Sequence, residues 1–586
     1  MSIVLREFSE IQEKMAEDKV IALDLETGGL SPWNSPIHVI AIYGPASDTI
    51  GILHYPRGRR VPREVLQWLA QREEIVTHNG VQFDIPFLAN AGMEWDKPYL
   101  YDTMIGEQSV LEVDRRDIKV NLKDTTKRHL GKVLDKAIDH GSWGLPELTD
   151  DALRYVTGDI SYILELQRAQ KAKGEERDTL RCIEFEMALA KPVLRMSLNG
   201  LPIDLNELER FFNSRSARHE ETDAFLRKEL GDINFRSFPQ LQTALLKRFG
   251  EGFFPDTRAE RLMEYTRTGG DLGAISEALL AWRNFKQRES MFSPEWRTKY
   301  VVDSPSGPRV HGRFWQVGTN TGRFSSAEPN LQQIPRDMRT CFGNHEGWAI
   351  GKTDYAAIEV RIAASLAEDA VMIQAFNDGE DIHRLVASAG FNKPPEAITS
   401  EERRIAKAMS FTLLFGGGVE TFRAYARANG SDIEESDALR AVDNFFAKFD
   451  GIRNMREAAI RRADSGYPLV IIYPTGLRRL LRGDQLRATT ILNNRVQGSA
   501  AAGMKKALLE CEKSGIAGYL SAVVHDELVY TAPINEIEEL RREVDQCMIR
   551  GMKWALEDEA PINIQVESSW GPTWASNPDT LAISEG

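Results

Sequence analysis

A nearly continuous apolar run close to the N-terminus, VIALDLE (Val20 to Glu26), has the pattern of a buried β-strand. Two glycines follow it, and strand-like and helix-like segments then alternate to about residue 175. A buried strand must lie inside a covered sheet, so this run restricts the fold more than any other feature and predicts an α/β domain. Asp24 and Glu26 lie within the run, two residues apart, so their side chains leave the same face of the strand.

The remainder of the chain predicts further domains. A length of 586 residues is too great for one compact core, and units of ~100–200 residues suggest three to five domains. Residues 180–300 have helical periodicity, and a Pro- and Gly-marked stretch from Asp303 to Pro308 indicates a boundary. Beyond it we expect a strand from Trp348 to Asp354, a long helical region and a hairpin from Gly518 to Ala532. The predicted fold class is therefore α/β and α+β, with several domains.

Composition excludes several classes of protein. No apolar run approaches the ~20 residues that cross a bilayer, and the N-terminal segment lacks the apolar core of a secretory signal. The four cysteines have no CxxC spacing, so we expect neither a zinc site nor disulfides, and a cytoplasmic protein. The net charge of −14 argues, by itself, against DNA as a partner, but the local concentration of cations matters more, and four arginines lie between Arg478 and Arg487.

Acidic residues of the front domain form a first candidate site. Asp84 follows an apolar turn, and Tyr155 and Asp159 lie four apart in a helical stretch, hence on one face. With Asp24 and Glu26 they supply four carboxylates and a phenol. Such a set can hold two cations ~3.5–4 Å apart and orient a water molecule against a phosphodiester. Each acid taken singly is more often a solvated structural residue.

A second acidic set lies far along the chain. Asp354 ends a predicted strand, whereas Asp526 and Glu527 lie at the tip of the predicted hairpin, where side chains point outward. The two aspartates converge only if the fold brings the two sheet segments side by side. Sequence spacing leaves that question open.

Between these acids lies a helix with a repeated pattern. Thr399 and Glu402 form a capping-box pair that predicts its start, and three glycines from Gly416 predict its end. Four residues inside it recur at every fourth position: Arg403, Lys407, Phe411 and Phe415. Two cations followed by two rings suit a ligand with a polyphosphate at one end and a flat base at the other. An amphipathic helix with core aromatics and solvated cations is the alternative.

Five motifs in fixed order carry a family resemblance over nearly the whole chain. They are TGRFSSAEPNLQQIP (Thr321 to Pro335), DYAAIEVR (Asp354 to Arg361), the helix just described, RVQGSAA (Arg495 to Ala501) and HDE (His525 to Glu527). Together they resemble DNA polymerase family A, the DNA polymerase I type, in a phage-like form. The acids of the front domain resemble the motifs of DEDD-superfamily 3′–5′ exonucleases that have tyrosine in the third motif.

This resemblance implies an RNase H-like exonuclease domain followed by a right-hand polymerase. We expect the exonuclease domain at 1–180, the thumb at 181–305, the palm at 306–375 and 489–586, and the fingers at 376–488. The implied function is template-directed addition of dNTPs to a primer 3′ end, with 3′–5′ proofreading, in DNA replication. Only 23 residues precede Asp24, so we expect no separate 5′ nuclease domain.

The resemblance also implies roles for individual residues. The residues implied in synthesis are Asp354, Asp526 and Glu527, and those implied in hydrolysis are Asp24, Glu26, Asp84, Tyr155 and Asp159. Two Mg²⁺ ions per site, with Mn²⁺ as a substitute, are expected on Asp354 and Asp526 and on the four carboxylates of the front domain. The dNTP would contact Arg403, Lys407, Phe411, Phe415, His383 and Glu359. Primer–template DNA would contact Arg323, Asn493, Gln497 and His525.

The chain departs from the family pattern at five positions: Ala356, Ala357, Ser410, Thr412 and Phe415. These departures spare the implied metal and phosphate ligands but leave template-base handling and fidelity open. Phe411, which lacks the hydroxyl of tyrosine, implies rejection of dideoxynucleotides. We expect a monomer, and the sequence identifies no helicase or processivity partner.

Two alternatives stand beside this hypothesis. A single-subunit RNA polymerase shares the palm and finger plan, but Glu359 would obstruct a ribose 2′-hydroxyl, and the exonuclease motifs also speak against it. A DNA-repair nuclease or DNA-binding factor with an inactive polymerase site would have lost one or more of four residues that are all present: Asp354, Asp526, Arg403 and Lys407.

Overall fold

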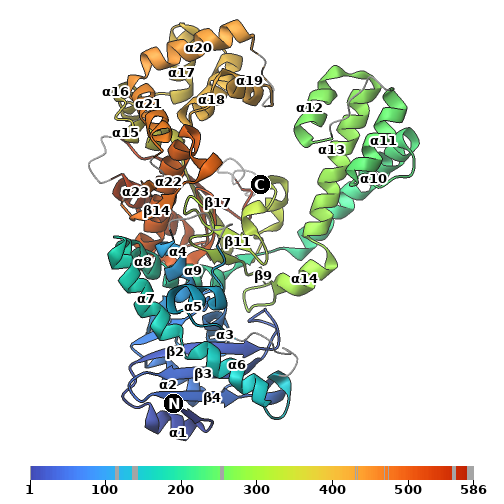
Figure 1. Ribbon diagram of the computed structural model, residues 1–586. Coiled ribbons are helices and arrows are strands. Elements are labelled where there is room, and N and C mark those ends of the chain that lie inside the picture. Colours follow the sequence, from blue (N-terminus) through green and yellow to red (C-terminus); the bar gives the residue numbers. More distant parts are fainter. Residues whose placement is uncertain are drawn as a thin grey trace.

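The computed structural model describes residues 2–111, 118–134, 143–250, 257–428, 431, 433–466, 469–472, 474–556 and 562–576. Figure 1 shows a sheet domain at the N-terminal end, a central body with a second sheet, a helical lobe beyond it and a long helical arm that projects to one side. Among the described residues, none of the helices has the length and apolar character that crossing a membrane requires.

The front domain is an α/β domain, as predicted. Its six-stranded sheet has the order β1-β4-β3-β2-β5-β6. The strands are β1 (Ile3–Leu5), β2 (Val20–Thr27), β3 (Ile37–Gly44), β4 (Thr49–His54), β5 (Glu74–Thr77) and β6 (Tyr99–Asp102). The predicted buried strand is β2, which pairs antiparallel with β3 and parallel with β5. Its helices are α1 (Phe8–Lys14), α2 (Arg63–Ala70), α3 (Asp84–Asn90), α4 (Thr103–Val110), α5 (Leu122–Leu130), α6 (Asp150–Ile160) and α7 (Ile163–Glu176).

Two consecutive helices join the front domain to the central body. In α8 (Leu180–Ala188) and α9 (Ala190–Asn199), Met187 and Leu194 belong to the core of the front domain, whereas Val193 and Met196 belong to that of the central body. Because these helices contribute to both hydrophobic cores, they hold the two parts against each other.

The arm has a small core of its own. It consists of α10 (Leu205–Leu230), α11 (Phe238–Phe249), α12 (Ala259–Thr268) and α13 (Gly270–Met291), and residues such as Leu226, Phe235 and Leu279 are buried among them. The helical prediction for residues 180–300 is confirmed across the described part. Beyond the arm come α14 (Pro294–Tyr300), β8 (Val301–Val302) and β9 (Arg309–Val310), and then the pair β10 (Arg313–Trp315) and β11 (Ser325–Ala327). The strand β7 (Leu201–Pro202), which precedes the arm, forms one small sheet with β8 and β9.

The central body is built on a four-stranded sheet of order β15-β16-β12-β17. The strands are β12 (Trp348–Tyr355), β15 (Leu520–Val524), β16 (Glu527–Pro533) and β17 (Val566–Gly571). The predicted strand and the predicted hairpin are therefore both present and lie in the same sheet. Two long helices that pack on each other, α22 (Ala488–Lys513) and α23 (Ile537–Ala555), belong to this body, and α23 also packs on β12, β16 and β17.

The helical lobe follows β12. It contains α15 (Ile358–Leu366), α16 (Ala370–Asn377), α17 (Ile382–Phe391), α18 (Ser400–Leu414), α19 (Val419–Ala428), α20 (Glu435–Lys448) and α21 (Asp450–Asp464), followed by β13 (Leu469–Ile472) and β14 (Leu477–Leu480). The capping box of Thr399 and Glu402 is confirmed at the start of α18. The helix ends before the glycines, at Leu414, with Phe415 as its C-cap.

A buried ion pair joins α8 to α22. Glu186 and Lys505 form a salt bridge with side chains 1% and 3% exposed, and Gln316 donates a hydrogen bond of 3.1 Å to the same carboxylate. Removal of one partner leaves the other charge buried without compensation, which costs more than the pair itself contributes. This pair therefore makes the α8–α22 contact dependent on both residues.

We predict that Lys505→Met lowers the free energy of unfolding by about 3–5 kcal/mol, measured by urea unfolding followed through tryptophan fluorescence. The double variant Glu186→Gln/Lys505→Met should recover most of that loss, because no uncompensated charge remains. A double variant as unstable as Lys505→Met would contradict the electrostatic explanation.

Candidate active sites

The central sheet brings the distant acids of the second set together. In the antiparallel pairing of β12 with β16, Asp354 lies directly opposite Glu527. The amide of Tyr355 donates a hydrogen bond of 3.3 Å to the carbonyl oxygen of Asp526. The question that sequence spacing left open is therefore answered by strand register: the two aspartates are neighbours.

A tight hairpin presents the second aspartate. Val524 pairs with Glu527, so His525 and Asp526 form a two-residue loop between β15 and β16. His525 has φ of 58°, the left-handed value that the first central residue of such a loop requires. The exposed side chain of His525 thus lies at the apex of the hairpin, beside Asp526.

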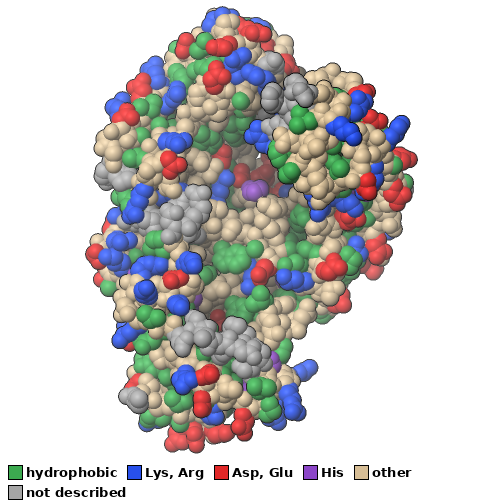
Figure 2. All heavy atoms as spheres, turned by 45° about the vertical axis from the view of Figure 1, so that its right-hand side comes forward, with side chains coloured by type: hydrophobic (Ala, Val, Ile, Leu, Met, Phe, Trp, Pro, Cys, Tyr) green, Lys and Arg blue, Asp and Glu red, His purple; other side chains and the backbone are tan. Residues whose placement is uncertain are grey.

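The two faces of the sheet have different partners. The hydroxyl of Thr353 donates to Asp545 at 2.9 Å and that of Tyr355 donates to the carbonyl oxygen of Met548 at 2.6 Å, so both side chains face α23. Because side chains alternate along a strand, Lys352 and Asp354 face the opposite way. Figure 2 shows a hollow between the helical lobe and the arm, with acidic side chains and a histidine at its floor.

Burial and neighbouring like charges both disfavour the charged form of Asp354. Partial burial and the charges of Asp526 and Glu527 raise the pKa of Asp354 to about 7. Glu527 itself is held by the protein: Arg339 Nη1 lies 3.2 Å from its carboxylate, and the indole of Trp574 donates to it at 2.9 Å. Glu527 is therefore fixed in position, and Arg339 is a site residue that no sequence motif indicated.

His383 of α17 lies beside the predicted stripe of cations and aromatic rings on α18. The rings of His383 and Phe411 lie 6.4 Å apart, and burial together with the charges of Lys407 and Arg403 lowers the pKa of His383 to about 4. Phe411 is half-buried and Lys407 is exposed, so the stripe is open to a ligand. Phe415 is also half-buried and packs against the core.

Asp381, an acid that the sequence analysis did not identify, binds the guanidinium of Arg403 in the stripe. Asp381 caps α17 by accepting from the amide of His383 at 3.0 Å, and it pairs with Arg403 at 2.6 Å. The Asp-x-His spacing before an apolar helical run was the available signal. A phosphate that bound Arg403 would compete with this carboxylate.

The candidate DNA contacts lie on three elements. Arg323 donates to Glu359 of α15, so the guanidinium and the carboxylate form an ion pair. Asn493 and Gln497 lie one turn apart on a single face of α22, with partly exposed side chains. Arg323 is thus bound to Glu359, the residue expected to exclude a ribose 2′-hydroxyl.

The first acidic set gathers around β2. Asp84, the buried first residue of α3, accepts a hydrogen bond of 2.8 Å from the amide of Leu25, between Asp24 and Glu26. Burial and the charge of Asp24 raise the pKa of Asp84 well above its usual range. Tyr155 and the buried Asp159 come from α6, which packs on β2 and β3.

Asp102 organises the turn before α3. Its buried carboxylate accepts hydrogen bonds from the amides of Asn79 at 2.8 Å and Val81 at 3.1 Å, and it caps α4 through Met104. The turn that delivers Asp84 is therefore held by an acid outside the predicted motifs. Its position at the end of a short strand, just before a helix, was its only sequence signal.

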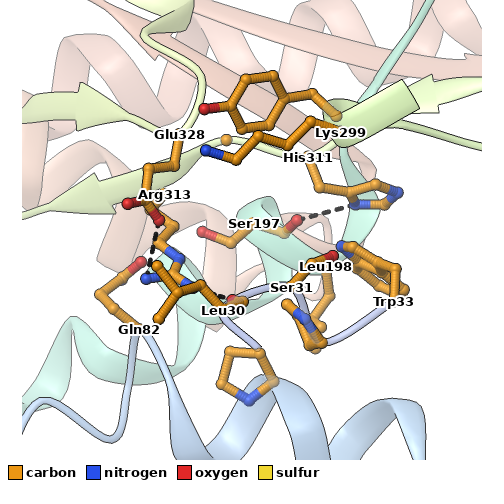
Figure 3. A pocket seen from close by; sticks show the side chains of 14 residues that line it. Leu30, Ser31, Trp33, Gln82, Ser197, Leu198, Lys299, His311, Arg313 and Glu328 are labelled. Carbon is orange, nitrogen blue, oxygen red and sulfur yellow. Dashed lines mark hydrogen bonds and ion pairs between the residues drawn. The ribbon is translucent and has the colours of Figure 1, made fainter. Parts of the chain in front are cut away.

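A small pocket marks the junction of the front domain with the central body (Figure 3). Arg313 donates to the carbonyl oxygen of Leu30, and the rings of Trp33 and His311 lie 4.1 Å apart. Gln82 accepts a hydrogen bond of 3.2 Å from the amide of Phe314. The loops that flank Glu26 and Asp84 are thus anchored to the central body.

Both acidic sets fit divalent cations, in different degrees. Among the described residues, no group of three or more His, Cys, Asp or Glu side chains is close enough to hold an ion by itself. The four front carboxylates therefore do not close around one point, although the charges of Asp24 and Asp84 interact. Mg²⁺ commonly binds one or two carboxylates together with water and substrate phosphates, which the pair Asp354 and Asp526 matches.

The pKa of Asp354 generates a prediction for stability against pH. Its folded-state value of about 7 lies above the ordinary 3.8, so the folded protein holds this proton more tightly than the unfolded chain. The contribution of this group to stability is therefore greatest at low pH and is lost as pH rises towards 7. Without divalent ions, Asp354→Asn should raise the midpoint of thermal unfolding more at pH 8 than at pH 5, and an equal effect at both would contradict the assignment.

Comparisons with known proteins identify two domains in this chain. The model of DNA polymerase family A matches residues 204–576, and that of a 3′-5′ exonuclease matches residues 5–173. DNA polymerase I of Aquifex aeolicus is 28% identical over 550 residues, covering 88% of this chain and 90% of that protein. DNA polymerase I of Mycobacterium tuberculosis (strain H37Rv) is 31% identical over 440 residues, covering 70% of this chain and 46% of that protein.

A further relative and a solved structure extend the match. DNA polymerase I of Chloroflexus aurantiacus is 28% identical, and the aligned region covers 97% of this chain but 62% of that protein. In fold, the chain is similar to the POL domain of Pol1 from M. smegmatis, solved in complex with DNA primer-template and dNTP, with a TM-score of 0.80, 24% identity and coverage of 98% and 99% of the two chains. The chain belongs to DNA polymerase family A and carries a 3′-5′ exonuclease domain in front of its polymerase domain.

Proposed function

We propose that this chain adds dNTPs to the 3′ end of a primer on a DNA template and removes mispaired 3′ nucleotides by hydrolysis. The observation that supports synthesis best is the register of β12 and β16, which sets Asp354 beside Asp526 and Glu527 on an open sheet face. Primer–template DNA and dNTPs are the proposed ligands, and a cytoplasmic monomer acting in DNA replication is the proposed setting.

The architecture supports a proposed assignment of thumb, palm and fingers. The arm, α10–α13, is proposed as the thumb, the β12–β15–β16–β17 sheet as the palm, and the lobe that contains α17 and α18 as the fingers. The expected thumb of residues 181–305 is wider than the arm, because α8 and α9 pack into both hydrophobic cores instead. We therefore propose α8 and α9 as the base on which the thumb stands.

In the synthetic site, Asp354 and Asp526 would hold Mg²⁺, or Mn²⁺ in its place, which supplies charge neutralisation during phosphoryl transfer. Arg403 and Lys407 would bind the triphosphate of the incoming nucleotide, with Arg403 exchanging Asp381 for phosphate oxygens. His383, which is neutral at pH 7, would act as a hydrogen-bond partner of the triphosphate.

Other residues would select the nucleotide and align the primer–template. Phe411 would lie against the sugar and base, and Glu359, held by Arg323, would exclude a ribose 2′-hydroxyl. Asn493, Gln497 and His525 would contact the minor groove, where acceptors occupy similar places in every base pair and so report pair shape. Phe415, at the C-cap of α18, would lie at the template side of the same pocket.

In the hydrolytic site, Asp24, Glu26, Asp84 and Asp159 would hold the cations, and Tyr155 would orient the attacking water. The raised pKa of Asp84 supports this assignment, because a divalent cation relieves the repulsion between Asp84 and Asp24. The rival function, a nuclease or DNA-binding factor with an inactive polymerase site, is disfavoured because the acids and the cations of the synthetic site are all present and lie on their expected elements.

Separate substitutions should separate the two activities. With Mg²⁺ and dNTPs, Asp354→Ala should reduce primer extension about a thousandfold or more, since metal ligation contributes several kcal/mol, and should leave hydrolysis of single-stranded DNA intact. Asp24→Ala should do the reverse. Loss of both activities in either variant, with the fold retained by circular dichroism, would contradict two independent sites.

Discrimination at the sugar provides a second test. Because Phe411 lacks a hydroxyl beside the sugar, the unmodified enzyme should strongly prefer deoxynucleotides to dideoxynucleotides, and Phe411→Tyr should relax that preference. The ratio of kcat/KM for ddNTP and dNTP incorporation measures it. Equal use of both substrates by the unmodified enzyme would refute the role of Phe411.

A further inference from the structure

A hollow lined by three cations and three acids opens beside Asp354 on the face of the central sheet that points away from α23. It has a volume of about 480 Å³ and is lined by Arg336, Arg339, Lys352, Asp354, Glu527, Glu567, Ser568, Ser569 and Ala575. In the pairing of β12 with β17, Lys352 lies opposite Ser569 and Asp354 opposite Glu567. Strand register therefore places Lys352 and the reacting acid on one surface.

The cations that line this hollow differ in whether they already form an ion pair with a carboxylate. Arg339 is bound to Glu527 and lies 4.0 Å from the ring of Trp574, so it is part of the framework. Lys352 donates to the carbonyl oxygen of Trp574, at 3.3 Å, and Arg336 is exposed. Within the part of the chain that the structure describes, neither Lys352 nor Arg336 has a carboxylate partner in an ion pair. The charges of Glu527 and Asp354 act on Lys352 without a direct ion pair, so both cations can still donate hydrogen bonds to an anion.

The position of the hollow indicates which anion. The residues proposed for the triphosphate lie on α17 and α18, and neither helix lines the hollow. A primer 3′-hydroxyl at Asp354 must be followed by its own phosphates within one or two nucleotides. The hollow adjoins Asp354 directly, so a backbone phosphate of the primer is the anion nearest to these cations.

The same segment is tied to the arm. Arg336 begins a short 3-10 helix, Arg336–Cys341, that packs on α10. Its neighbour Asp337 accepts two hydrogen bonds of 2.9 Å from Arg288 of α13, in the paired geometry that fixes orientation. The arm therefore determines where Arg336 stands relative to Asp354.

We propose that Arg336 and Lys352 form a clamp for a backbone phosphate of the primer strand next to its 3′ end, positioned by the arm through the Arg288–Asp337 pair. The clamp rests on the proposed function, since it requires a primer terminus at Asp354. Its residues are positioning residues: they hold the strand and do not touch the reacting atoms.

The test uses the full chain and a fluorescent primer–template hairpin without dNTP. Arg336→Ala/Lys352→Met should weaken binding about tenfold and reduce the slope of log K against log salt by about 0.9, because one neutralised phosphate contributes about 0.9. The KM for dNTP should stay within about twofold. Lys352→Arg alone should retain the affinity and the slope.

A matched control removes two cations from the other face of the same domain. Arg542→Ala/Lys553→Ala, on α23, should leave affinity and slope unchanged, and circular dichroism with an unchanged thermal unfolding midpoint reports that the clamp variant is folded. A clamp variant with unchanged affinity and slope, or with a raised KM for dNTP alone, would overturn the clamp. Failure of the unmodified enzyme to extend the primer would instead overturn the proposed function.

Discussion

The antiparallel pairing of β12 with β16 is the interaction on which the synthetic half of the molecule depends. Backbone hydrogen bonds set the register, and the register alone decides that Asp354 meets Glu527 and, through the adjacent loop, Asp526. A shift of one residue would turn Asp354 towards α23, where Thr353 and Tyr355 now bind. Hydrogen bonds to Asp545 and Met548 thus help to hold the acid in place from the opposite face.

Repulsion between carboxylates is a shared cost of both sites. Asp354 and Asp84 each have a raised pKa because burial and a neighbouring acid disfavour the charged form. Other acids near the two sites are neutralised or hydrogen-bonded by the protein itself. Glu527 binds Arg339 and Trp574, and Asp102 accepts hydrogen bonds from three backbone amides. What remains is a small number of acids whose charge favours a divalent cation.

The two sites share one mechanical frame. The front domain shares α8 and α9 with the central body, the buried pair of Glu186 and Lys505 locks that contact, and the loops beside Glu26 and Asp84 are anchored at Arg313 and Phe314. The arm is coupled to the central sheet through Arg288 and Asp337. A net charge of −14 is compatible with the proposed DNA ligand because cations such as Arg336 and Lys352, which have no direct ion pair among the described residues, lie at the site itself.

Many strands and helices of this chain could be predicted from its sequence, because they depend on local interactions. The apolar run of β2, the capping box at Thr399 and the alternation around the hairpin at His525 depend on near neighbours, so the pattern predicted their strands and helices. The family resemblance implied roles for most of the proposed site residues, including His383 and Arg323. The sequence did not predict roles for Arg339, Asp381 and Asp102, because those roles come from partners distant in sequence. Convergence of Asp354 with Asp526, the incomplete closure of the front carboxylates and the hollow at Lys352 were decided only by tertiary structure, since strand register and packing between segments, not spacing along the chain, determine which charges meet.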